Sequence, residues 1–215
     1  MTPQMAVWGQ TLRDEAPWLV ATQPTSWPGI ILFEALVMSD LVQPPTRNFS
    51  PEIQVLIMDV DGVLTDGGII RDDAGQQIKR FHVRDGSGIV AWRRLNRHVA
   101  LITGKESMVV QHRADELGIQ YVYQNVSNKL ETYQDLLGQL GFSDAQAAYI
   151  GDDLPDLPVM RRCGCPIAVA DAAEEVRAAA HYITKYPGGY GAVRDAIEWL
   201  CKQMNVWDQV LARYT

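Results

Sequence analysis

The sequence has few of the residues that build disulfide or zinc sites. Its 215 residues include only three cysteines and four histidines. Cys163 and Cys165 are too close together for a usual zinc knuckle, and no two histidines have the spacing of a zinc-binding helix. We therefore expect these two cysteines and Cys201 to be packing residues of a protein from the reducing cytoplasm.

Long apolar runs and an excess of positive charge are also missing. The apolar stretch 30–38 contains Glu34 and is too short to span a bilayer, and no basic segment of a secretory signal opens the chain. The net charge of -7 argues against a partner with a phosphate backbone, although it leaves room for a local anion site. We expect a cytoplasmic protein with no nucleic-acid and no membrane partner.

Clear periodicity is absent from the first 51 residues, which hold three of the six tryptophans and several prolines. This composition predicts a poorly structured N-terminal extension, 1–51, that ends in a proline-rich linker. One hypothesis is that Met38 is the true initiator. A compact domain is expected over 52–204, and residues 205–215 are expected to be a tail that is disordered or docks on a neighbouring subunit.

From residue 52 onward, apolar strand-like runs alternate with amphipathic segments. Strands are expected at 53–60, 98–103, 121–123, 147–150, 167–170 and 181–184. Helices are expected at 87–97, 107–117, 130–140, 158–163, 172–180 and 191–204. A β-hairpin is expected over 68–83, with its turn at 72–75. This alternation predicts an α/β fold with a Rossmann-like, doubly wound, mostly parallel sheet and a protruding hairpin.

Polar side chains gather just after four of the predicted strands. In order along the chain they are Asp59, Asp61 and Thr65, then Thr103 and Gly104, then Lys129, then Asp152, Asp153 and Asp156. Each of them alone is more typical of a turn, a helix cap or a solvated surface. Because ligands of such sheets lie at the carboxyl ends of the strands, the joint pattern predicts one site.

The residue types in this pattern indicate phosphoryl transfer. Several carboxylates in one place repel each other, and a hard divalent cation with oxygen ligands, Mg²⁺, relieves the repulsion. One carboxylate can then attack phosphorus and form an aspartyl-phosphate. A lysine and a threonine hydroxyl can hold the phosphoryl oxygens as charge develops.

These motifs resemble those of the haloacid dehalogenase superfamily of phosphatases: D-V-D-G-V-L-T at 59–65, I-T-G at 102–104, Lys129, and G-D-D-L-P-D at 151–156. The resemblance implies Asp59 as nucleophile and Asp61 as general acid and base, with Thr103 and Lys129 binding phosphate. It implies that Mg²⁺ is held by Asp59, by the backbone carbonyl of Asp61 and by Asp152, with support from Asp153 and Asp156. Thr65 and Gly104 would contact the substrate.

Within this superfamily, residues 53 to about 200 resemble a cap-less branch. The stretches that carry the resemblance are 59–67, 81–89, 123–129, 148–160 and 188–195. The branch acts on 3-deoxy-D-manno-octulosonate (KDO) 8-phosphate in lipopolysaccharide biosynthesis, and it also holds phosphatases for nine-carbon sialic-acid-type sugars. The resemblance implies a homotetramer in which the hairpin builds the core and a neighbouring subunit covers each site.

Two positions depart from the pattern of this branch, and both bear on the substrate. Lys105 stands where the branch usually has arginine, and a lysine lacks the fork that binds a carboxylate with two hydrogen bonds. Tyr190 replaces the arginine of a G-G-R-G motif. Arg84 is a further candidate for substrate contact, and an ion pair with Asp85 or a solvated side chain is the alternative. A nine-carbon sugar phosphate or a broader range of sugar phosphates therefore stays open.

Two interpretations from other functional classes remain. A phosphorelay receiver domain also combines acids, a threonine and a lysine on a parallel sheet. In a receiver, however, the phospho-acceptor follows the third strand and the lysine comes last, whereas here Lys129 precedes the final acids. A catalytically silent interaction module on the same fold is disfavoured because every motif side chain is present.

Overall fold

The computed structural model describes residues 52–214. The extension, the linker and the initiator hypothesis for Met38 lie outside the described residues. The three cysteines are free and buried, as the sequence predicts. Across 52–214, no helix is long and apolar enough to cross a membrane.

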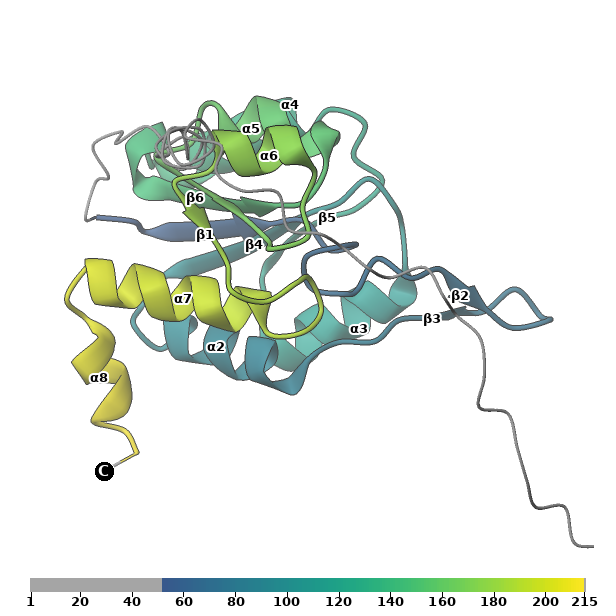
Figure 1. Ribbon diagram of the computed structural model, residues 1–215, viewed down its shortest axis with the longest axis horizontal. Coiled ribbons are helices and arrows are strands. Elements are labelled where there is room, and N and C mark those ends of the chain that lie inside the picture. The colour runs from purple at the N-terminus through teal and green to yellow at the C-terminus, as the bar shows by residue number, and fades with distance from the viewer. Residues whose placement is uncertain (1–51, 215) are drawn as a thin grey trace, which may run out of the picture. The chain divides into compact units, whose positions relative to one another are not determined.

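Six strands, all paired in parallel, form the central sheet (Figure 1). They are β1 (Val55–Met58), β4 (His98–Ile102), β5 (Tyr121–Tyr123), β6 (Ala147–Gly151), β7 (Cys165–Ala168) and β8 (Tyr182–Ile183). Every residue of β1, β6 and β7 is buried, as expected for strands that helices cover on both faces. The strands predicted from the sequence are confirmed: three are shorter than predicted, β5 matches, β6 is one residue longer, and β7 begins two residues earlier.

The order of these strands indicates which edge of the sheet binds ligands. The sheet runs β5-β4-β1-β6-β7-β8. Numbered along the chain within this sheet, that is 3-2-1-4-5-6, the Rossmann order rather than the 2-1-3-4-5 order of receiver domains. The chain changes direction across the sheet between β1 and β6, and ligands of such sheets bind at the carboxyl ends beside this point.

Helices cover both faces of the sheet (Figure 1). One face carries α2 (Val83–Arg93), α3 (Met108–Leu117) and α7 (Ala192–Gln203), and the other carries α4 (Lys129–Leu140), α5 (Leu157–Met160) and α6 (Glu174–Ala179). Two short 3₁₀ turns, η1 (Asp144–Gln146) and η2 (Leu154–Asp156), flank β6. α3 and α4 end at Gly118 and Gly141 in the left-handed conformation, as the sequence predicts.

Helix α2 begins at Val83, one turn earlier than the predicted start at residue 87. Two glycines in its first half, Gly86 and Gly88, weaken the helix propensity and hid this turn. A tertiary contact stabilises it: the buried Asp85 side chain accepts hydrogen bonds from the Gly191 amide at 3.2 Å and the Arg194 amide at 2.7 Å. These bonds join α2 to the start of α7.

The predicted hairpin is confirmed, with its turn after Arg71 and with short strands, whereas the tail is not disordered. The strands β2 (Ile70–Arg71) and β3 (Gln77–Ile78) have two residues each, and the hairpin projects away from the sheet (Figure 1). Their isoleucines are exposed. The tail contains a helix, α8 (Trp207–Leu211), which packs on α7 of the same chain with Val210 buried. No other large insertion separates the motifs within 52–214, so this domain has no cap.

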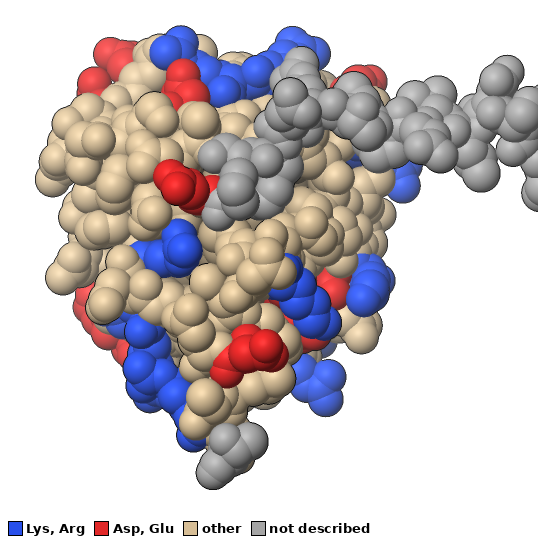
Figure 2. All heavy atoms as spheres, turned by 90° about the vertical axis from the view of Figure 1, so that its left-hand side faces the viewer, with Lys and Arg blue, Asp and Glu red and all other residues tan. Residues whose placement is uncertain are grey.

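Charged side chains of both signs are scattered over the face shown in Figure 2. Neither sign covers that face as a whole. The surface there has the mixed charge of an ordinary soluble-protein exterior rather than a continuous basic stripe.

The Asp85 contact can be tested by mutation. We expect Asp85→Ala to lower the free energy of unfolding by about 1–3 kcal/mol, because one buried and one partly buried amide at the start of α7 lose their acceptor. Urea denaturation measures the change. Asp115→Ala, on the exposed side of the neighbouring helix α3, is the matched control and should change stability much less. Equal effects of the two substitutions would show that the contact contributes nothing.

Candidate active site

A pocket of about 500 Å³ lies at the carboxyl ends of the strands. Asp59 follows β1, Thr103 follows β4, and Asp152 follows β6. Most of the site residues predicted from the sequence line this one pocket: Asp59, Asp61, Thr103, Gly104, Lys105, Lys129, Asp152 and Asp153. The fold thus brings together side chains that are up to 94 positions apart in the chain, as their places after the strands predict.

The centre of the pocket is an ammonium group held between two carboxylates. Lys129, the first residue of α4, lies 2.9 Å from Asp59 Oδ2 and 2.7 Å from Asp156 Oδ1. All three side chains are largely buried, with exposed fractions of 7% for Lys129, 13% for Asp59 and 1% for Asp156. Charges at this depth are stable only when they are paired.

Asp156 supports the site rather than facing the pocket. Its Oδ1 accepts hydrogen bonds from the Tyr149 hydroxyl and Lys129 Nζ, both at 2.7 Å. Its Oδ2 accepts from the amides of Asp152 at 3.0 Å and Asp153 at 3.3 Å. Four donors use the capacity of a carboxylate. Asp156 therefore fixes the position of the loop after β6 and of Lys129. The family resemblance implies such a supporting role through hydrogen bonds.

Asp152 has the features of a metal ligand. Its Oδ1 atom is buried and has no hydrogen-bond partner within residues 52–214. One oxygen from each of Asp59, Asp152 and Asp156 lies within 4.8 Å of the others, close enough to surround one cation. Carboxylate oxygens are the donors that Mg²⁺ prefers, so the residues fit this ion. Each oxygen of Asp59 has one partner, the Val60 amide or Lys129, whereas each oxygen of Asp156 accepts from two donors.

The carboxyl groups of this cluster have raised pKa values when no divalent cation is bound. Burial raises the pKa of Asp152 to about 8, and the charges of Asp59 and Asp156 add to the rise. Burial also raises the pKa of Asp59, against the opposing effect of Lys129. For Lys129, burial opposes the charged form, but Asp59 and Asp156 outweigh it and raise the pKa. A divalent cation would favour the ionised form of both pocket carboxylates.

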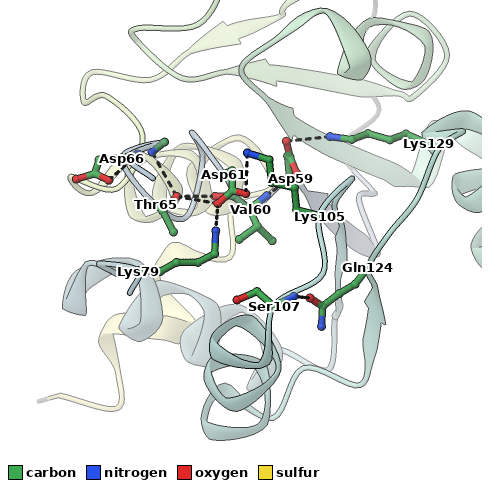
Figure 3. Close-up of polar contacts among 12 residues, drawn as sticks. Asp59, Val60, Asp61, Thr65, Asp66, Lys79, Lys105, Ser107, Gln124 and Lys129 are labelled. Atoms are coloured by element: carbon green, nitrogen blue, oxygen red, sulfur yellow. Dashed lines mark hydrogen bonds and ion pairs between the residues drawn. The ribbon is translucent and has the colours of Figure 1, made fainter. Parts of the chain in front are cut away.

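Asp61 lies apart from this cluster, on the hairpin side of the pocket. Lys79 Nζ donates a hydrogen bond to Asp61 Oδ1, and Lys105 Nζ lies 4.0 Å from Oδ2 (Figure 3). One carboxylate in the pocket thus faces the metal cluster, and the other lies between two lysines. This separation suits two different tasks, a nucleophile and a proton-transfer group.

Two predicted contact residues do not face the pocket. Thr65 is buried, and its hydroxyl contacts Val60 O at 3.4 Å and Asp61 Oδ1 at 3.5 Å, so it shapes the loop after β1. Arg84 lines a separate hollow together with Tyr190 and Arg194, so the single chain does not bring it to the site. Of the two alternatives predicted for Arg84, the ion pair with Asp85 is not formed among residues 52–214, and the residue is exposed, as a solvated side chain requires.

Three residues that position the site were not predicted from the sequence. Tyr149 lies in the middle of β6, and its hydroxyl donates a hydrogen bond to Asp156. The apolar pattern of this strand gives no sign of that contact. Lys79 reaches Asp61 across 18 positions, which no local spacing encodes. Asn128 caps α4 by accepting the Glu131 amide at 3.3 Å, and so sets the start of the helix that presents Lys129. An asparagine three positions before a glutamate is a readable capping signal.

Comparison with known proteins agrees with this geometry. The family model for haloacid dehalogenase-like hydrolases matches residues 105–197. The 3-deoxy-D-manno-octulosonate 8-phosphate phosphatase of Salmonella typhimurium is 44% identical over 168 residues, which are 78% of this chain and 89% of that protein. The chain belongs to the haloacid dehalogenase-like hydrolases. Within that family it is a phosphatase.

Solved structures of this family share the fold. The crystal structure of the Moraxella catarrhalis KDO 8-phosphate phosphatase, in complex with magnesium, phosphate and KDO, has a TM-score of 0.75 and 41% identity, over 77% of this chain and 95% of that one. The cobalt-bound enzyme of Haemophilus influenzae has a TM-score of 0.70 and 39% identity, over 72% of this chain and 91% of that one.

The acid cluster predicts a stability that depends on both pH and metal. The raised pKa of Asp152 means that the folded, metal-free chain favours the protonated acid. Its contribution to stability is therefore present below the unfolded pKa near 4 and is lost as the pH rises through about 8. We expect the free energy of unfolding in EDTA to fall over this range, and Asp152→Asn to flatten the fall.

The measurement is urea denaturation at several pH values, with EDTA or with excess Mg²⁺. Mg²⁺ should stabilise the wild type most at the alkaline end, because it binds the ionised carboxylates of the folded state. Asp152→Asn should lose most of this stabilisation. Asp115→Asn, on exposed α3, is the control and should keep it. A wild-type chain indifferent to Mg²⁺ at every pH would contradict the assignment of this cluster as a metal site.

Proposed function

We propose that this phosphatase hydrolyses KDO 8-phosphate to KDO and phosphate, with Mg²⁺ as cofactor. The observation that carries the proposal is the pocket at the carboxyl edge, where Asp59, Asp152 and Lys129 converge, in a chain that is 44% identical to a KDO 8-phosphate phosphatase. The magnesium, phosphate and KDO bound in the Moraxella catarrhalis relative support the same ligands here. We infer a cytoplasmic location from the three free thiols.

The residues of this pocket divide the reaction between them. Asp59 attacks the phosphorus atom and forms an aspartyl-phosphate as the bond to the sugar oxygen breaks. Lys129 and Thr103 hold the phosphoryl oxygens. A bound Mg²⁺ would neutralise the carboxylates and polarise the phosphoryl group. Asp61 gives a proton to the leaving sugar oxygen and then takes one from the water that releases phosphate and restores Asp59.

Positive charge is kept near both positions where the branch usually has arginine, although Tyr190 lines a hollow apart from the pocket in the single chain. The guanidinium of Arg80 lies 4.5 Å from the centre of the Tyr190 ring. An arginine group from the hairpin therefore lies beside the position where the branch usually places its own. Lys105 still supplies a positive charge at the mouth of the pocket, with 62% of its side chain exposed. A second candidate stays open, the phosphate of a nine-carbon sialic-acid-type sugar.

We also propose that the chain works as a homotetramer. The pocket has no cap over it, and the hairpin exposes Ile69, Ile70 and Ile78, with exposed fractions of 74%, 50% and 54%. A two-stranded hairpin with strands this short is marginally stable alone. Burial of these side chains between copies of the chain would stabilise the hairpin and cover the open site.

A phosphate-release screen tests the substrate and the nucleophile together. With Mg²⁺, we expect KDO 8-phosphate to give the highest kcat/KM among sugar phosphates, with nine-carbon analogues measured side by side. Asp59→Asn should lower kcat by about 10³-fold or more, because the amide keeps the shape and loses the attacking oxygen. Circular dichroism should show the same fold. Turnover by Asp59→Asn close to the wild-type rate would disprove the role of Asp59 as nucleophile. A higher kcat/KM for a nine-carbon sugar phosphate would identify that compound, and not KDO 8-phosphate, as the substrate.

The tetramer is tested by light scattering after size-exclusion chromatography. We expect the wild type to elute with the mass of four chains, and Ile70→Asp and Ile78→Asp to elute as smaller species, because a buried, unpaired carboxylate opposes association. Ile183→Asp is the matched control: Ile183 is also exposed, at 44%, but lies in the edge strand β8. A monomeric wild type, or a tetramer in both hairpin variants, would contradict this assembly.

A further inference from the structure

Lys79 is a largely buried charged group that the hairpin brings to Asp61. It directly follows β3, and only 10% of its side chain is exposed. Its ammonium donates to Asp61 Oδ1, the group proposed for proton transfer (Figure 3). Lys105, on the other side of Asp61, is 62% exposed and lies 4.0 Å from Oδ2. The two lysines are therefore not equivalent: one is buried in direct contact and the other is solvated.

The residue after Lys79 anchors it to the rest of the domain. Arg80 Nη2 lies 2.5 Å from Asp66 Oδ2, and its guanidinium stacks on the Tyr190 ring. Asp66 belongs to the loop that follows β1, and Tyr190 belongs to the loop before α7. The position of Lys79 therefore does not depend on the short hairpin strands alone.

The two loops that Arg80 joins are themselves in close contact. The Gly189 amide donates to Val63 O at 3.0 Å. A Cβ atom on Gly188 would lie 1.7 Å from Gly62 O, so these backbones touch with no room for a side chain. The loop after β1, the loop before α7 and the exit of the hairpin thus form one connected support for Asp61.

A lysine at this depth needs a compensating role. Its desolvation costs free energy, and Asp61 is its only charged partner among the ion pairs of residues 52–214. The terminal torsion of an aspartate is soft, so an unsupported carboxylate would present either oxygen in many orientations. A hydrogen bond to Oδ1 fixes the group and leaves Oδ2 toward Lys105, which lines the pocket.

We propose that Lys79 is a positioning residue for the hydrolysis: it holds Asp61 by Oδ1, so that Oδ2 serves the leaving sugar oxygen and the attacking water. Arg80 is its anchor. This inference rests on the proposed function, because it acts through the proton-transfer role of Asp61. It makes the hairpin part of the catalytic machinery as well as an assembly element.

A double-mutant cycle separates this role from direct substrate binding. The four proteins are the wild type, Lys79→Met, Asp61→Asn and the double variant, assayed for phosphate release from KDO 8-phosphate with Mg²⁺. We expect Lys79→Met to lower kcat by about 10- to 100-fold with little change in KM, since misplacement of a catalytic group acts on the chemical step. In the Asp61→Asn background, the same substitution should change kcat by less than about twofold.

Two further variants sharpen the cycle. Lys79→Arg keeps a cationic donor and should retain more activity than Lys79→Met. Arg80→Ala leaves Lys79 in place but removes its anchor, and should lower kcat by a smaller factor. Because Arg80 is half exposed, with 53% of its side chain accessible, this variant keeps the proposal testable if Lys79→Met does not fold. Lys202→Met, which removes an exposed lysine at the end of α7, is the control and should match the wild type.

The outcomes are distinct. Equal losses from Lys79→Met in both backgrounds, a rise in KM with kcat unchanged, or an unaffected kcat in Arg80→Ala would overturn the positioning role while the phosphatase function stands. A wild-type chain that releases no phosphate from any sugar phosphate would overturn the proposed function and this inference with it. Non-additive losses in kcat, partly restored by arginine, would establish the role.

Discussion

A buried ammonium between two carboxylates is the interaction on which the site depends. Lys129 bridges Asp59, which follows β1, and Asp156, which follows β6. It therefore ties together the two strands at which the sheet changes direction. Without this cation, two acids would be buried side by side at a cost of several kcal/mol each. The lysine thus contributes to folding as well as to the phosphate site, because both need a positive charge at the same point.

Around this centre, the rigid and the peripheral parts of the domain supply different functions. The sheet positions Asp59, Thr103 and Asp152 through buried strands, and Tyr149 within β6 fixes Asp156. Asp61 is supported instead from outside the sheet, by the hairpin and the loop before α7. The proposed nucleophile and metal cluster therefore need only the Rossmann core, whereas the proposed proton-transfer group depends on the hairpin, which is also the proposed contact between copies of the chain.

The features that depend on hydrophobic periodicity and on strand order could be predicted from the sequence. Apolar strands with polar residues after them placed Asp59, Thr103, Lys129 and Asp152 at one edge, because parallel strands bring their carboxyl ends together. Prediction failed where a tertiary hydrogen bond decides the structure. Helix α2 begins earlier than predicted because Asp85 accepts hydrogen bonds from amides more than 100 positions away in the chain. Arg84 was expected near the substrate, but its place in the first turn of α2 directs it to another hollow. Lys79 was missed for the same reason, since hairpin geometry brings it to Asp61.

The unpartnered oxygen of Asp152 has a consequence for how the metal enters. An acid with a pKa of about 8 carries a proton at neutral pH in the metal-free chain. Cation uptake must expel that proton, so loading is an exchange rather than a simple addition. Acidification would then oppose binding of the ion. Loading in a weakly buffered solution would release acid, a signal that reports occupancy of the site without any substrate.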